Sequence, residues 1–82
     1  MKKDQIISIV NDFLINEIEI DETKIKNDAH LKNDLGIDSL DFVDIVVIVE
    51  KNFGFKMNAE EMSGVNTLSQ FYDFIESKIV DR

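Results

Sequence analysis

The residues best suited to chemistry lie between Asp34 and Asp41, in the order Asp-Leu-Gly-Ile-Asp-Ser-Leu-Asp. An acid just before a helix and another three residues later are typical of a helix start, so Asp38 and Asp41 predict that a helix begins at Ser39. The Ser39 hydroxyl is then exposed. An anionic group at this position faces free backbone N–H groups and the positive end of the helix dipole. Taken alone, Asp-Ser-x-Asp usually indicates capping only.

Other reactive constellations are missing from the sequence. The chain has no cysteine, and His30 is the only histidine, so no nucleophile–histidine pair is expected beside Ser39. The carboxylates lack the spacing of a calcium loop, and no glycine-rich phosphate loop occurs. We therefore expect no catalytic residue and no metal site, and a protein that is not an enzyme.

Helical spacing of apolar residues predicts the elements that position Ser39. The first helix begins near Asp4, which is a candidate cap, and ends between Ile15 and Glu17. The last helix follows a cap at Asn66 or Thr67, with cations near its end that suit the helix dipole. Those cations are Lys78 and Arg82. A short helical turn is predicted from 58 to 62, closed by Gly64.

The middle segment, 39–53, is rich in β-branched residues, which favours a strand by propensity alone. Its length and its capping pattern favour a helix instead. Its apolar residues form two stripes. One can face the core: Phe42, Ile45, Val46, Val49 and Phe53. The other is left for the fold or a partner to cover: Leu40, Val43 and Val47.

About twenty residues, 18–37, connect the first two helices. This is long for a compact domain, but six apolar residues can pin the connection to the core. They are Ile18, Ile20, Ile25, Leu31, Leu35 and Ile37. The predicted fold class is all-α, with a single domain over residues 1–82.

Composition limits the possible partners. The net charge of −8 over 82 residues excludes nucleic acid as a natural ligand, because phosphates repel an acidic surface. The longest apolar run is too short to span a bilayer, and no signal-peptide core is visible. Together with the absence of cysteine, these features predict a soluble cytoplasmic protein, and we expect a monomer.

The stretch from Asp34 to Leu40 resembles the D-L-G-x-D-S-L signature of the acyl carrier protein family, and the order of predicted elements extends this resemblance over nearly the whole chain. The resemblance implies a small four-helix bundle with one very short helix. It also implies that a phosphopantetheinyl transferase uses coenzyme A to attach 4′-phosphopantetheine to Ser39. The thiol of this arm then holds an acyl group as a thioester, for fatty-acid, lipid or polyketide-type biosynthesis.

The resemblance further implies that basic-surfaced acyl-handling enzymes (synthases, reductases and acyltransferases) dock on the second helix. The residues carried over to that face are Asp38, Leu40, Asp41, Val43, Asp44, Val47 and Glu50. Three positions depart from the common fatty-acid carriers. Phe42 replaces a smaller residue and can narrow an internal acyl pocket, Lys51 replaces an acid, and Asn58 replaces a proline. These departures favour a specialised carrier over a housekeeping fatty-acid carrier.

Two alternatives stay open at this point. The chain could be an aminoacyl or peptidyl carrier, although its acidic surroundings favour the acyl type. It could also be an unmodified acidic interaction module with the same fold. The two classes differ at Ser39, which an unmodified module does not need.

Overall fold

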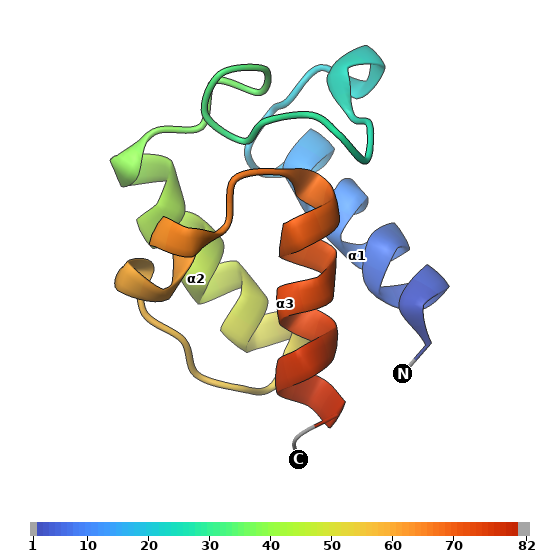
Figure 1. Ribbon diagram of the computed structural model, residues 1–82, viewed down its shortest axis with the longest axis vertical. Helices are drawn as coiled ribbons and strands as arrows, with labels where there is room; N and C mark the ends of the chain where they lie inside the picture. Colours follow the sequence, from blue (N-terminus) through green and yellow to red (C-terminus); the bar gives the residue numbers. More distant parts are fainter. Residues whose placement is uncertain (1, 81–82) are drawn as a thin grey trace.

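The computed structural model describes residues 2–80, which form three α-helices and two short 3₁₀ helices around one core (Figure 1). In chain order these are α1 (Lys3–Asn16), η1 (Glu22–Lys24), α2 (Ser39–Phe53), η2 (Ala59–Gly64) and α3 (Leu68–Val80). No strand occurs between residues 2 and 80. The predicted all-α bundle is confirmed, and its short helix is of the 3₁₀ type.

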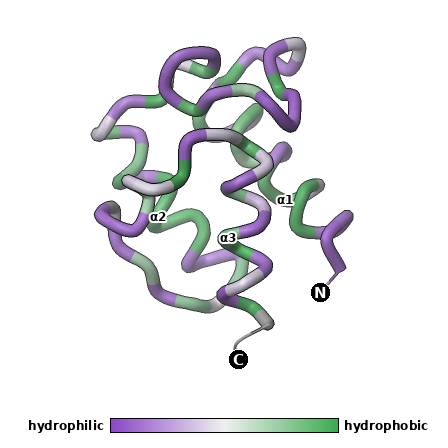
Figure 2. The backbone as a smooth tube through the Cα atoms, viewed as in Figure 1, coloured by the Kyte–Doolittle hydropathy of each residue, from purple (hydrophilic) through white to green (hydrophobic). Residues whose placement is uncertain are grey.

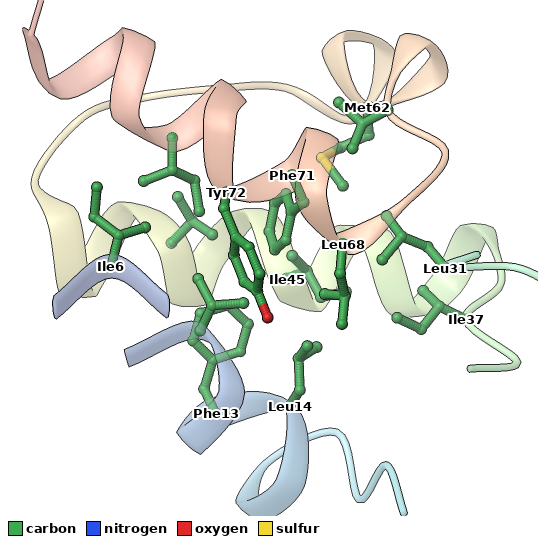
Figure 3. Packing of buried hydrophobic residues seen from close by; sticks show 14 of the residues in the cluster. Ile6, Phe13, Leu14, Leu31, Ile37, Ile45, Met62, Leu68, Phe71 and Tyr72 are labelled. Carbon is green, nitrogen blue, oxygen red and sulfur yellow. The ribbon is translucent and has the colours of Figure 1, made fainter. Parts of the chain in front are cut away.

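The three long helices meet through their apolar faces. Phe13 and Leu14 of α1, Ile45 of α2 and Phe71 of α3 are almost fully buried and point into a common core (Figure 3). The hydroxyl of Tyr72 also reaches inward and donates a hydrogen bond to Asn11 Oδ1 at 2.5 Å. Burial raises the pKa of this hydroxyl.

The predicted helix boundaries agree with the structure except at the first cap and at the short turn, since η2 runs to Gly64 and ends at the C-cap Val65. The helix α2 covers the predicted range, and α1 ends where expected. The cap predicted at Asp4 is wrong: Lys2 is the N-cap residue and Asp4 lies in the first turn. Gln5 Oε1 accepts a hydrogen bond from the Lys2 N–H at 2.9 Å, so the helix can start earlier. Arg82, predicted near the end of the last helix, lies outside the described residues.

The long connection is polar along most of its length but is fastened to the core (Figure 2). Leu31, Leu35 and Ile37 are buried, while Ile18, Ile20 and Ile25 pack against the core from the side. Its residues 27–31 also bind the segment that begins α3, because the Leu31 N–H donates to Asn66 O at 2.9 Å. The predicted pinning is confirmed, and η1 is an additional turn that the apolar pattern did not reveal.

The short helix η2 lies beside α2 and is tied to α3. Met62 of η2 is buried in the core, and Glu61 pairs with Lys78 of α3 at 3.2 Å. Asn58 caps this helix by accepting a hydrogen bond from the Glu61 N–H at 3.1 Å. None of the helices in the described range is long and apolar enough to cross a bilayer.

Candidate functional site

The start of α2 is a capping box built from two acids. Asp38 Oδ1 accepts hydrogen bonds from the N–H groups of Leu40 and Asp41, both at 3.0 Å. Asp41 Oδ2 accepts one in return from the Asp38 N–H at 3.2 Å. The acids around Ser39 therefore hold the first turn of the helix in place, as the sequence predicts.

This arrangement corrects one expectation about the backbone. The sequence predicts free backbone N–H groups at this helix start, but the Asp38 carboxylate already accepts hydrogen bonds from two of them, those of Leu40 and Asp41. The Ser39 N–H has no hydrogen-bond acceptor within the described residues. A phosphate at Ser39 thus meets one open N–H and the helix dipole, beside two carboxylates.

Ser39 is the first residue of α2, and its side chain is exposed. Its hydroxyl makes no hydrogen bond to any described residue, so modification breaks no contact of the folded protein. Gly36, three residues earlier, has φ +72°, a left-handed conformation that favours glycine. This turn follows the buried Leu35 and precedes the buried Ile37, which together anchor the approach to Ser39.

The outer face of α2 continues from Ser39 as a mixed apolar and acidic surface. Its three apolar side chains are the exposed large hydrophobic residues of the described chain: Leu40 at 78%, Val43 at 54% and Val47 at 62%. Asp38, Asp44 and Glu50 are exposed around them, and Asp41 is half-buried. Six of the seven residues predicted for this face therefore lie on α2, Asp38 caps its start, and all seven are at least partly accessible.

The inner stripe of α2 is less uniform than predicted. Ile45, Val49 and Phe53 are buried, but Phe42 and Val46 are only half-buried. Phe42 instead lines an open hollow of about 310 Å³, together with His30, Asn33 and Asn66. The sequence did not indicate this hollow, because its walls come from α2 and two loops that are distant along the chain.

The described part of the chain holds no cluster of histidine, cysteine or carboxylate residues that could bind a metal ion. The site is an exposed serine at a capped helix start, next to an apolar and acidic face. Such a site can carry a covalent group and present it to other proteins. The structure places Ser39 at the helix start and leaves the predicted face accessible, and the roles of these residues stay predictions.

Comparisons with known proteins bear on this arrangement. Residues 5–75 match the family described as phosphopantetheine attachment site. The chain is similar to the acyl carrier protein of Coprothermobacter proteolyticus, with 33% identity over 79 residues that cover 96% of both chains. It is 32% identical to that of Thermotoga maritima over 77 residues, covering 94% and 95% of the two chains. It is also 38% identical to that of Cyanophora paradoxa over 72 residues, covering 88% of this chain and 70% of the relative.

Proposed function

Because the chain belongs to the acyl carrier protein family, whose members are carriers and not enzymes, we propose that Ser39 is the attachment residue for its 4′-phosphopantetheine. The observation that carries this proposal is the exposed, unbonded Ser39 hydroxyl at the first position of α2. The cofactor supplies a thiol, which this chain without cysteine lacks, and the thiol holds the acyl cargo as a thioester.

Attachment needs a base and a positioned nucleophile, and this chain provides only the nucleophile. The Ser39 oxygen forms a bond to the phosphorus of coenzyme A that bears the pantetheine. The diphosphate bond breaks, adenosine 3′,5′-bisphosphate leaves, and the serine proton passes to a base of the transferase. Asp38 and Asp41 are engaged at the helix start, so we assign them to holding Ser39 in place.

Intact mass after incubation with coenzyme A and a broad-specificity phosphopantetheinyl transferase tests the attachment residue. We expect a gain of one phosphopantetheine, absent in Ser39→Ala. Ser69→Ala is the matched control, since Ser69 is also an exposed serine in the first turn of a helix and should not affect the gain. A gain that survives Ser39→Ala contradicts the assignment. No gain in any variant favours an unmodified interaction module.

We further propose that the outer face of α2 docks the transferase and basic-surfaced acyl-handling enzymes. The three exposed apolar side chains can be buried against a partner. The acids around them attract a basic surface and raise the rate at which the two proteins associate. Such charge pairs contribute little affinity each, which suits a carrier that must release its partners. The cytoplasm, where thiols stay reduced, is the compartment that we propose for these encounters.

The docking proposal is tested by the rate of modification at low salt. Asp44→Asn removes one charge from the face, and we expect the rate to fall by about twofold to fivefold, the range of one exposed ion pair. Asp28→Asn removes the same charge from the connecting loop and serves as the control. Equal rates for the two variants contradict a role for this face.

A further inference from the structure

The outer face of α2 ends in a positive charge at the end farthest from Ser39. Lys51 is the one cationic residue of α2; it lies in the last turn and is exposed. Lys51 follows Leu40 by eleven residues and Val47 by four, which are about three turns and one turn of helix. Lys51 therefore continues the exposed apolar stripe, on the side of the helix that faces away from the core.

The charge of this face changes sign along the helix. Residues 38–44 hold three acids and no cation, whereas residues 50–56 hold one acid and two exposed lysines, Lys51 and Lys56. Figure 1 shows α2 running from the connecting loop to the end of the molecule where α3 also ends. The twelve residues from Ser39 to Lys51 span about 18 Å along the axis, so a partner that covers the whole face meets both signs.

The fold does not use the charge of Lys51 in an ion pair. Among residues 2–80 Lys51 forms no ion pair, and its helix neighbours three and four positions away are apolar or glycine: Val47, Ile48 and Gly54. By contrast, Lys78 in the last turn of α3 pairs with Glu61 at 3.2 Å. Both lysines suit the helix dipole, but of the two only Lys51 keeps its amine free for a contact outside the chain.

Exposure does not cancel the effect of this charge on an approaching protein. Water hydrates the amine, but exposed charges still act on each other over about 8 to 10 Å at moderate salt. A uniformly basic partner surface would bring like charges together at Lys51, which disfavours the encounter. A surface with bases near Ser39 and an acid about 18 Å farther along is complementary to the whole face. Such a surface fits in one direction only, which brings Ser39 to the partner's active site.

From these observations we infer that the transferase that modifies this chain carries an acidic side chain opposite Lys51, in addition to basic side chains near Ser39, and that this pair sets the direction in which the carrier docks. The inference deepens, and rests on, the proposed docking of the transferase on α2. Lys51 is then a specificity-determining residue, because it favours a transferase with the matching acid and disfavours one whose docking surface is basic throughout.

The first test measures kcat and KM for modification with coenzyme A by the transferase of the organism that makes this chain, at low salt. We expect Lys51→Glu to lower kcat/KM by about threefold to tenfold, through KM, because one exposed attraction becomes a repulsion. Lys51→Gln, which adds no acid to the end of the helix, should lower kcat/KM by about twofold. Lys26→Glu makes the same change of charge at an exposed lysine of the connecting loop and should not lower it.

The possible results separate this inference from the proposals on which it rests. No modification of the wild type overturns the attachment at Ser39, and equal rates for Asp44→Asn and Asp28→Asn overturn the docking face; either result overturns the inference as well. Where both proposals hold, equal kcat/KM for Lys51→Glu and Lys26→Glu, or a lower kcat with an unchanged KM, overturns the inference alone.

A second readout locates the acid on the transferase. A carbodiimide joins a lysine amine to a carboxylate in contact with it, and Ser39→Ala prevents modification while the complex is being cross-linked. We expect peptide masses to show Lys51 joined to an aspartate or glutamate of the transferase, and a change of that acid to lysine should restore the rate of Lys51→Glu. Absence of a Lys51 cross-link, or no gain in rate from exchanging the two charges, overturns the inference.

Discussion

The N-termini of α2 and α3 share a capping motif, but the first residue of α2 is exposed and that of α3 is buried. In α3, Thr67 Oγ1 accepts from the Gln70 N–H at 3.2 Å, and Gln70 Oε1 accepts from the Thr67 N–H at 3.1 Å. This is the capping box that Asp38 and Asp41 form in α2 with charged side chains. A capping box alone therefore does not make a functional site.

The difference lies in what covers each helix start. At α3 the long connection closes the first turn, because the N–H groups of Leu68 and Ser69 donate to Ala29 O and Asn27 O. The first residue, Leu68, is fully buried. At α2 the first residue is the exposed Ser39, with its N–H and hydroxyl unbonded within the described chain. The fold uses one helix start for stability and leaves the other open for modification.

The largest effect should come from exchanging the first residue of each helix for alanine. Leu68→Ala removes a fully buried side chain and should lower the free energy of unfolding by about 2–5 kcal/mol. Ser39→Ala should change it by less than about 0.5 kcal/mol, as expected for an exposed position. Urea unfolding measures both, and intact mass should show modification lost only in Ser39→Ala. Similar losses of stability in the two variants contradict the contrast.

The next effect concerns the two glycines that precede these helices. Gly36 has φ +72°, and no heavy atom lies within 4 Å of the place that a Cβ would take, so Gly36→Ala meets backbone strain but no clash. We expect it to cost about 1–2 kcal/mol of unfolding free energy. Gly64→Ala meets open space without a positive φ and should be neutral or stabilise by up to about 1 kcal/mol. Thermal unfolding of both variants measures the difference, and an equal cost for both would show that Gly36 is not required by its conformation.

Removing either capping side chain should lower the free energy of unfolding by a smaller amount, similar for the two helices. Asp38→Ala and Thr67→Ala each remove the side-chain acceptor of a capping box and should each lower the free energy of unfolding by about 1 kcal/mol. Denaturant unfolding gives both values. Because Asp38 also orders the turn that presents Ser39, only Asp38→Ala should slow modification. Slower modification in Thr67→Ala would indicate that the two starts are coupled.

Local chemistry explains why so much of this fold could be predicted. The positions of α2, of its capping acids and of its exposed stripe follow from spacing and from N-terminal residue preferences, which depend on neighbouring residues only. The cap predicted at Asp4 is wrong for a related reason. The Gln5 side chain can also accept a hydrogen bond from the backbone at the helix start, and it does so from the Lys2 N–H. The residue pattern does not indicate which of the two side chains marks the start.

The remaining features depend on contacts between distant segments. The closure of α3 by residues 27–31, the half-exposed position of Phe42 and the hollow that it lines arise only when the connection folds onto α3. The apolar pattern of residues 18–37 gives no sign that backbone carbonyls of this segment accept hydrogen bonds from the start of another helix. The occupied N–H groups of Leu40 and Asp41 could have been anticipated, since a capping acid necessarily takes the groups that a phosphate would use.

The smallest effect on stability is expected for Asp38→Asn, which separates the two roles of Asp38: hydrogen-bond acceptor and negative charge. Asp38→Asn keeps an oxygen that can accept from Leu40 and Asp41, so the free energy of unfolding should fall by only a few tenths of a kcal/mol to about 1 kcal/mol, through the weaker interaction with the helix dipole. The same variant lacks a charge that attracts a basic transferase. At low salt its modification should therefore slow by about twofold to fivefold, and the deficit should shrink as salt screens the charge. Rates equal to wild type at every salt concentration would mean that Asp38 serves Ser39 only as a cap, and that α2 and α3 differ in exposure alone.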